Sequence, residues 1–318
     1  MKILYSNEAN FKDEFRALVD RSNIDMQSVM PIVNGIINDI KERGDAALNE
    51  QIAKFDTWEV NGNLAITTDE MKAAYDNLDD KLRNALKLAY ERIKAYHEKQ
   101  VEKSWIDFEP SGAILGQKVT PVDRAGLYIP GGKAAYPSSL IMNAVPAIVA
   151  GVKEIVVCTP AVGGEVNSLL LAAMHLLGIK TAYKVGGASA VAAMAYGTQT
   201  IKKVDVITGP GNIFVATAKK MVYGDVNIDM IAGPSEIGVI ADESANPTHI
   251  AIDLLSQAEH DEIASSFLIT FSAEFANKVN DEIQRLLPNL KRYEIAKASI
   301  DNKAAIIVAC DIDECIEL

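Results

Sequence analysis

From Trp105 onward, short runs rich in β-branched and aromatic residues alternate with segments whose apolar residues recur at helical spacing. The β-rich runs include AILGQKVTPV, GLYIP, EIVVCTP, KTAYKV, VDVITG, IGVIAD, SFLITF and AAIIVA. Strands that alternate with helices pair in parallel, because each helix carries the chain back across the sheet before the next strand begins. We therefore predict an α/β fold in which mainly parallel sheets carry helices on both faces.

The segment before Trp105 has the periodicity of helices almost throughout, and its clearest helix runs from Asp79 to Glu102. After it, the strands and helices fall into two blocks, one from about Tyr128 to Ser235 and one from Ile237 to the end. The 318 residues, 49% hydrophobic and 23% charged, are enough for about two domains with cores of their own.

Charge and composition narrow the choice of partners. The formal net charge is −12 and no run is rich in Lys or Arg, so we expect no nucleic-acid partner and instead a small molecule. The first residues lack the apolar core of a signal peptide, and no apolar run is long enough to span a membrane. Three cysteines are too few for a disulfide framework or a thiolate zinc site, which favours a cytoplasmic protein.

Four turns contain glycine or proline where a ligand could approach the backbone. They are IPGGKAAYPSS (129–139), VGGASAVAAMAYG (185–197), GPGN (209–212) and AGPSE (232–236). Three of them follow a strand, and open α/β sheets bind ligands outside the carboxyl ends of strands. A helix beginning near Asn212 would offer free N–H groups to an anion. None of the four matches GxGxxG, so the usual dinucleotide fingerprint is absent.

The helix that begins at the Asn-Pro pair 246–247 has an unusual polar face. At about 100° per residue, His249, Asp253, Gln257 and His260 fall on one side of it. Imidazole, amide and carboxylate groups together are typical of a metal or polar-substrate surface, although a solvated helix face has the same pattern. Zinc takes three or four protein ligands, so two from this helix would need others from elsewhere. Asp253 is a candidate for orienting such ligands.

Five motifs in this order closely resemble the histidinol dehydrogenase family, most tightly from Arg124 to His260. They are RAGLYIPGGKAAYPSSLIMNAVPA, VGGASAVAAMAYGT, GPGNIFVATAK, IDMIAGPSEIGVIAD and DLLSQAEH. The resemblance implies two incomplete Rossmann-like domains. The expected boundaries are a helical N-terminal arm over 1–22, a discontinuous first α/β domain over 23–127 and 236–318, and a second over 128–235.

The resemblance also implies an activity, the zinc-dependent oxidation of L-histidinol to L-histidine through a bound aldehyde with two NAD+ in succession. Gln257 and His260 match zinc ligands of the family that also contact the substrate. Ser235 matches a serine that contacts the substrate. Tyr128 and Asn212 match positions that contact NAD. The family's intertwined homodimer is expected here as well.

Two departures from the family pattern change these expectations. Ser189 stands where the family usually has an NAD-contacting glutamine, and its shorter side chain would reach the same group through water. The segment DIDECIEL starts a helix at Asp311 but ends within two turns. By its match to the family, a catalytic Glu-His pair and two zinc ligands would lie beyond Leu318. We therefore expect the 318-residue chain to be almost inactive by itself.

Two other functions stay open at this point. One is a related zinc- and NAD-dependent alcohol dehydrogenase that acts on another polar alcohol. The other is a non-catalytic protein that retains dimerisation or ligand binding.

Overall fold

The computed structural model describes residues 1–20, 26–61, 63–131, 136–231, 233 and 235–318. The chain forms two compact units, Met1–Ile24 with Gly233–Leu318 (unit 1) and Asp25–Ala232 (unit 2). This division differs from the expected one, because residues 25–127 belong with the block that follows them and the N-terminal residues belong with 236–318. The expectation of an α/β fold with mainly parallel sheets is confirmed.

The sheet of unit 2 has the strand order β6-β5-β4-β7-β8, and every pairing in it is parallel. Its strands are β4 (Arg124–Tyr128), β5 (Glu154–Thr159), β6 (Thr181–Lys184), β7 (Val206–Thr208) and β8 (Asn227–Ile228). Both faces of this sheet are buried. In β5, Val156 and Cys158 belong to one hydrophobic core and Val157 to the other, as the alternation of side chains along a strand requires.

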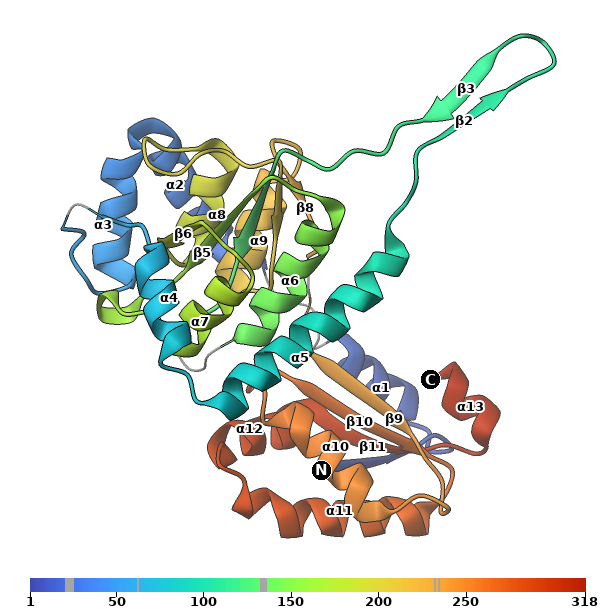
Figure 1. Cartoon of the computed structure of the whole chain (residues 1–318). Coiled ribbons are helices and arrows are strands. Elements are labelled where there is room, and N and C mark those ends of the chain that lie inside the picture. The colour runs from blue at the N-terminus through green and yellow to red at the C-terminus, as the bar shows by residue number, and fades with distance from the viewer. Residues whose placement is uncertain (21–25, 62, 132–135, 232, 234) are drawn as a thin grey trace. The chain divides into compact units, whose positions relative to one another are not determined.

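Helices from the N-terminal hundred residues complete both layers of unit 2, which is why this segment does not form part of unit 1 (Figure 1). One core contains residues of α2 (Met26–Arg43), α3 (Asp45–Phe55), α8 (Gly187–Tyr196) and α9 (Ile213–Val222). The other contains residues of α4 (Thr68–Asp76), α5 (Asp80–His97), α6 (Pro137–Ala150) and α7 (Ser168–Leu176). Short 3-10 turns follow α5 (η1, Glu98–Gln100) and β5 (η2, Val162–Gly164).

An antiparallel hairpin, β2 (Trp105–Phe108) with β3 (Ile114–Gln117), interrupts the parallel pattern. It extends away from the sheet of its own unit (Figure 1). All residues of both strands are exposed, including Ile106 at 69% and Phe108 at 73% of their surface. A two-stranded hairpin without a core to pack on is only marginally stable by itself.

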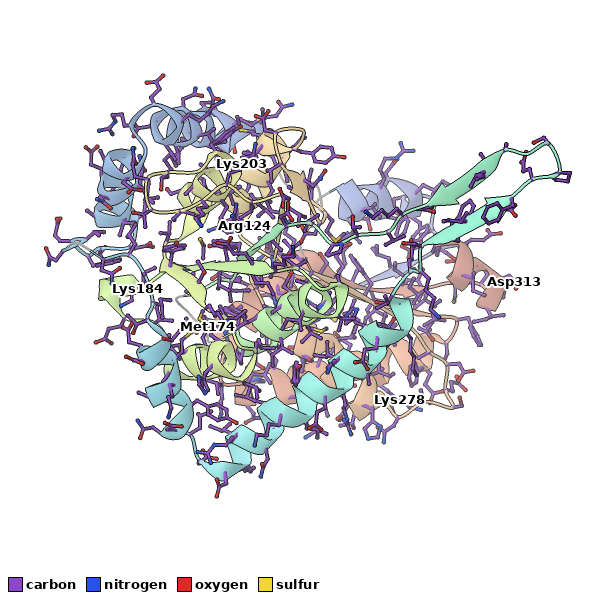
Figure 2. All side chains as sticks on the ribbon, turned by 45° about the horizontal axis from the view of Figure 1, so that its top comes forward. Arg124, Met174, Lys184, Lys203, Lys278 and Asp313 are labelled. Atoms are coloured by element: carbon purple, nitrogen blue, oxygen red, sulfur yellow. The ribbon has the colours of Figure 1, made fainter. Side chains whose placement is uncertain are left out.

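The amino ends of the strands in unit 2 are tied together by Arg124, the first residue of β4. Its side chain forms an ion pair with Glu154 (2.8 Å) on β5 and donates a hydrogen bond to the carbonyl oxygen of Lys203 (2.6 Å). Its backbone N–H donates to Asp205 (2.8 Å), just before β7. Figure 2 labels Arg124 and Lys203 in this region. The opposite, carboxyl edge of the sheet is therefore the one left for a ligand.

Unit 1 has a parallel sheet of order β1-β11-β10-β9. Its strands are β1 (Lys2–Tyr5), β9 (Glu236–Ile240), β10 (Ser265–Thr270) and β11 (Ala304–Val308). Its helices are α1 (Phe11–Asp20), α10 (Pro247–Ala258), α11 (Ala273–Leu286), α12 (Tyr293–Lys303) and α13 (Ile312–Glu317). The 3-10 turn η3 (Leu287–Asn289) follows α11. The run AAIIV in β11 is apolar throughout because both faces are covered: Ile306 packs with α10, α11 and α12, and Ile307 packs with α1.

The helical N-terminal arm expected over 1–22 contains a helix, α1, but begins with a strand. Residues Lys2–Tyr5 form an edge strand that pairs in parallel with β11, with Ile3 opposite Ile306 and Leu4 opposite Ile307. Four residues are too few to give a readable alternation of side chains, and their partner lies at the other end of the sequence.

Within the described residues, no helix combines the length and apolar character needed to cross a bilayer.

Candidate functional site

A cavity of about 660 Å³ lies at the carboxyl edge of the sheet of unit 2. It is lined by residues of the four loops that follow β4, β5, β6 and β7, together with residues of α2 and α3. Both predicted NAD contacts, Tyr128 and Asn212, are among them. Ser189, the residue that departs from the family pattern, lines it as well. Inside such a cavity, backbone N–H groups at helix starts are suited to bind anions.

Tyr128 is the last residue of β4 and has only 4% of its surface exposed. Its hydroxyl oxygen accepts a hydrogen bond from the backbone N–H of Gly187 (3.2 Å), the first residue of α8. Burial raises the pKa of Tyr128 to about 12, and the nearby Asp56 also raises it. The phenol therefore keeps its proton at neutral pH and can donate a hydrogen bond to a ligand.

The GPGN turn is fixed against β4 by a close backbone approach. Gly209 has φ +121°, and a Cβ atom there would lie 2.0 Å from the carbonyl oxygen of Tyr128. At the end of this turn, Asn212 begins α9, and its side-chain oxygen accepts hydrogen bonds from the N–H groups of Phe214 (3.1 Å) and Val215 (3.2 Å). Two of the N–H groups that the sequence led us to expect free are thus occupied by the cap. Helix α8 receives no side-chain hydrogen bond from its N-cap residue Gly186, and the N–H groups of Gly186 and Gly187 are bonded to Asp56 and Tyr128 instead.

A buried lysine that the sequence analysis overlooked holds the same turn. Lys219 on α9 has 4% of its surface exposed, donates to the carbonyl oxygen of Gly209 (3.0 Å) and forms an ion pair with Asp229. Asp229 in turn accepts a hydrogen bond from the N–H of Gly209 (2.9 Å). Both backbone groups of Gly209 are therefore bound to a charged side chain. The signal in the sequence was the position of Lys219 on the apolar face of IFVATAKKMV.

Asp56, also overlooked, lines the cavity from the end of α3 and has 8% of its surface exposed. Its side chain accepts a hydrogen bond from the backbone N–H of Gly186. The next residue, Thr57, has φ +57°, the left-handed conformation that a β-branched residue rarely adopts. Nothing in the sequence AKFDT marks this strain. The carbonyl oxygen of Asp56 accepts a hydrogen bond from the N–H of Gly163 (3.1 Å), which lies in a distant loop.

The predicted metal ligands lie in unit 1, where Asn246 and Pro247 begin α10 as expected. The helix ends at Ala258, so Gln257 lies in its last turn and His260 in the turn that follows, whereas both were expected on one helix. The N–H of His260 nevertheless donates to the carbonyl oxygen of Gln257 (3.0 Å). Arg292 fixes this turn by donating from its side chain to the carbonyl oxygen of His260 (3.2 Å).

Ser235 lies at the same edge of the sheet as these two residues. It precedes β9, and its carbonyl oxygen accepts a hydrogen bond from the N–H of Ser265 (3.0 Å), the first residue of β10. Because α10 connects β9 to β10 and runs back across the sheet, its C-terminal end lies at the amino ends of both strands. This is the edge opposite to the one where α/β sheets usually bind ligands.

The side chains at this edge include two of the types that bind zinc, an amide and an imidazole. Gln257 is half-buried, and its side-chain Nε2 is buried without a hydrogen-bond partner in the described part of the chain. A half-turn of this amide would place its oxygen there as a metal ligand. His260 and Asp253 are exposed. Among the described residues, no group of three or more His, Cys, Asp or Glu side chains is arranged to hold a metal ion.

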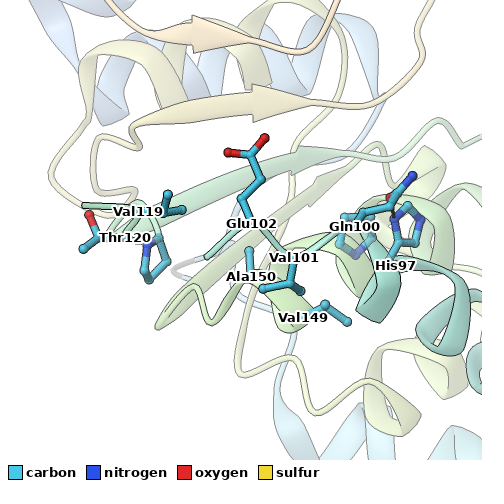
Figure 3. A pocket seen from close by; sticks show the side chains of 10 residues that line it. His97, Gln100, Val101, Glu102, Val119, Thr120, Val149 and Ala150 are labelled. Atoms are coloured by element: carbon cyan, nitrogen blue, oxygen red, sulfur yellow. Dashed lines mark hydrogen bonds between the residues drawn. The ribbon is translucent and has the colours of Figure 1, made fainter. Parts of the chain in front are cut away.

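The remaining histidines have structural surroundings. His175 packs against the ring of Tyr75 with 5.1 Å between ring centroids, and His249 is exposed near the start of α10. His97 hydrogen-bonds Gln100 (2.6 Å) beside a second, open cavity of about 430 Å³ (Figure 3). That cavity is lined mainly by apolar residues from the base of the hairpin and from α6, and none of the predicted site residues lines it.

Comparison with known proteins gives one consistent result. The model of the histidinol dehydrogenase family matches residues 19–318. The histidinol dehydrogenases of Sulfurimonas denitrificans and Wolinella succinogenes are 62% and 60% identical, over 98% and 100% of this chain and 73% and 74% of those proteins. A crystal structure of histidinol dehydrogenase from Elizabethkingia anophelis is 35% identical and superposes with a TM-score of 0.92, over 100% of this chain and 72% of that one.

Proposed function

Because this chain belongs to the histidinol dehydrogenase family, a family of NAD-dependent oxidoreductases, we propose that its substrate is L-histidinol and its product L-histidine. The identity of 62% to a named histidinol dehydrogenase is the observation that carries this proposal. In the first oxidation step the alcohol carbon would lose a hydride to NAD+ and its hydroxyl group a proton to solvent or a base, which gives the aldehyde. In the second step water would add to the aldehyde, and the hydrate would lose a hydride to a second NAD+ and a hydroxyl proton, which gives the acid. A cytoplasmic location fits the free cysteines Cys158, Cys310 and Cys315.

NAD is assigned to the cavity at the carboxyl edge of unit 2. The support is the meeting there of the Tyr128 hydroxyl, the start of α8 and Asn212. The side-chain oxygen of Gln51, which also lines the cavity, is buried without a hydrogen-bond partner among the described residues, as expected of a group that awaits a ligand. Ser189 would reach NAD through water, because its side chain is short.

The test of this assignment is NAD binding by the 318-residue chain. Asn212→Ala should weaken NAD binding about tenfold or more, because the loss both removes an amide donor and loosens the start of α9. Asn277→Ala is a matched control, because Asn277 lies on the exposed side of α11 in unit 1. Equal NAD affinity of both variants and the wild type would place NAD elsewhere.

Zinc is assigned to Gln257 and His260, with Ser235 as a substrate contact at the same edge. One amide oxygen and one imidazole nitrogen are neutral ligands, so a zinc ion held by them would keep its positive charge to polarise and orient a polar substrate. Two ligands make half of the usual shell, and we therefore propose weak zinc binding and low turnover for the 318-residue chain by itself.

The zinc assignment is tested by titrating zinc into the chain and its variants. Gln257→Ala and His260→Ala should each abolish the measurable affinity, whereas His249→Ala should leave it unchanged although it removes a histidine from the same helix. Turnover is tested by NADH formation from L-histidinol, with the Sulfurimonas denitrificans enzyme as the reference. Turnover comparable to that enzyme would contradict the expectation of low activity and would make His249 the first candidate for the base.

A homodimer is the proposed assembly, and the hairpin β2–β3 is the proposed contact. Its exposed apolar side chains would form an apolar patch in a monomer, which soluble proteins rarely leave uncovered. Phe108→Ser with Ile106→Ser should shift the chain toward monomer in light scattering. Val162→Ser, which removes another exposed apolar residue outside the hairpin, serves as the control. An unchanged mass for the hairpin variant would assign the interface to another surface.

A further inference from the structure

We propose that Asp56 accepts hydrogen bonds from the adenosine ribose of the bound dinucleotide and disfavours a phosphate at its 2′ position, so that the site selects NAD over NADP. This inference rests on the proposed NAD site. It adds a specificity-determining residue that none of the sequence motifs identified.

The position of Asp56 satisfies what this role requires. Asp56 has 8% of its surface exposed, and it lines the cavity that also holds Tyr128. One carboxyl oxygen lies 3.1 Å from the position that a Cβ atom would take on Gly186, so the absence of a side chain there brings the carboxyl group beside the start of α8. A ligand whose pyrophosphate lies at that helix start would have a ribose within reach.

The backbone around Asp56 is held in a costly conformation. Thr57 has φ +57°, the only positive φ of a non-glycine residue in the described part of the chain. Strain of this kind persists where the surroundings fix a functional geometry. The carbonyl oxygen of Asp56 accepts the N–H of Gly163 (3.1 Å), which anchors the strained turn to the loop after β5.

The chemistry of the cavity gives Asp56 no partner that would explain a buried charge. Among the described residues that line the cavity, it is the only carboxyl group, and the only cation is Lys54, which is exposed and lies over the ring of Phe55. Burial raises the pKa of Asp56, and the hydrogen bond from Gly186 only partly opposes this effect. Burying this carboxyl group is unfavourable in the free protein. Hydrogen bonds from the hydroxyl groups of a ligand would offset that cost and so explain why the residue is placed there.

The selectivity follows from charge. A ribose diol offers two hydroxyl donors to a carboxylate, as in many dinucleotide sites. A 2′-phosphate carries negative charge and no comparable donor, so it would meet a like charge in a poorly solvated place. Loss of a hydrogen bond to a charged group corresponds to about a tenfold change in affinity or more.

The test is the affinity of the chain for NADH and NADPH, followed by fluorescence, in wild type, Asp56→Asn and Glu59→Gln. Asp56→Asn should weaken NADH binding about tenfold while leaving or improving NADPH binding, so the preference for NADH shrinks. Glu59→Gln removes the same charge three residues later, outside the lining of the cavity, and should change neither affinity. Equal effects of Asp56→Asn on both cofactors, or none, would overturn the proposal.

Two further measurements separate this role from a structural one. Without cofactor, Asp56→Asn should unfold at the same or higher urea concentration than wild type, because asparagine keeps an acceptor for Gly186 and removes a buried charge. Earlier unfolding of the variant would mean that Asp56 serves the fold. With the wild type, AMP should bind better than 2′-deoxy-AMP, and equal binding would also overturn the proposal. If Asn212→Ala instead leaves the NAD affinity unchanged, the assignment of NAD to this cavity is itself wrong.

Discussion

Lys219 donates a hydrogen bond to the carbonyl oxygen of Gly209 from inside the protein, 3.0 Å away and with only 4% of its surface exposed. Its charge is balanced by Asp229, which accepts the N–H of the same glycine (2.9 Å). A charge pair therefore binds both backbone groups of one residue in the turn that leads to Asn212. Burying charges is unfavourable unless they are paired, so this arrangement is sensitive to the loss of either partner.

Lys219→Met should destabilise the chain by roughly 3 kcal/mol, the lower end for breaking a buried pair, because Asp229 keeps 30% of its side chain exposed. The released turn should also lower NAD affinity. Urea denaturation and NADH fluorescence measure the two effects, with the exposed Lys220→Met as the control. A variant that loses stability but binds NADH as before would limit the pair to a role in folding.

Gly209→Ala should be among the most destabilising substitutions in unit 2. The new Cβ atom would lie 2.0 Å from the carbonyl oxygen of Tyr128, in addition to the strain of a positive φ. Gly178→Ala is matched to it, since Gly178 has φ +70° and open space around it. We expect about 1 to 2 kcal/mol for Gly178→Ala and more than roughly 3 kcal/mol for Gly209→Ala. If urea denaturation gives similar losses of unfolding free energy for Gly209→Ala and Gly178→Ala, the turn at Gly209 can move away from β4 to make room for the new Cβ atom.

Thr57→Gly should raise stability by about 1 kcal/mol, because glycine adopts φ +57° without strain and this gain exceeds its entropic cost. Thr120→Gly, at an exposed loop position without positive φ, should instead be neutral or destabilising. The shift in the urea midpoint distinguishes the two. If Thr57→Gly is destabilising, contacts of the threonine side chain outweigh the strain.

The pH dependence of stability should carry the signature of Asp56. Burial raises its pKa in the folded protein, so the folded state holds this proton to a higher pH than the unfolded chain does. The unfolded carboxyl ionises near pH 3.9, and stability is therefore lost as the pH rises from there through the raised pKa. Asp56→Asn removes that loss. The difference in unfolding free energy between variant and wild type should grow over this interval and then level off, and a constant difference would contradict the shift.

Much of the fold could be predicted from local pattern, and its division into units could not. The alternation of strands and helices identified parallel sheets, and the apolar run of β11 indicated a strand buried on both faces. The placement of residues 25–127 depended on which sheet their helices cover, and amphipathic helices do not specify their partner. The edge strand Lys2–Tyr5 was missed for the same reason, because its register is set by β11.

The candidate site shows the same limit. The motifs named Tyr128 and Asn212, and these two residues line one cavity. Lys219 and Asp56 carry no motif, and their importance arises from burial and from contacts made across the fold. The assignment of zinc to Gln257 and His260 stays a prediction, because it depends on ligands from outside this turn.

The pairing of β1 with β11 determines the order in which the chain folds during synthesis on the ribosome. Lys2 pairs with Ala305 and Tyr5 with Val308, so the edge strand waits for a partner that is made about 300 residues later. Unit 2 is continuous from Asp25 to Ala232 and folds as soon as it emerges. The segment Lys2–Tyr5 is therefore among the last to be ordered, and a ribosome stalled before Ala304 would leave it exposed to proteases although the cavity of unit 2 is already complete.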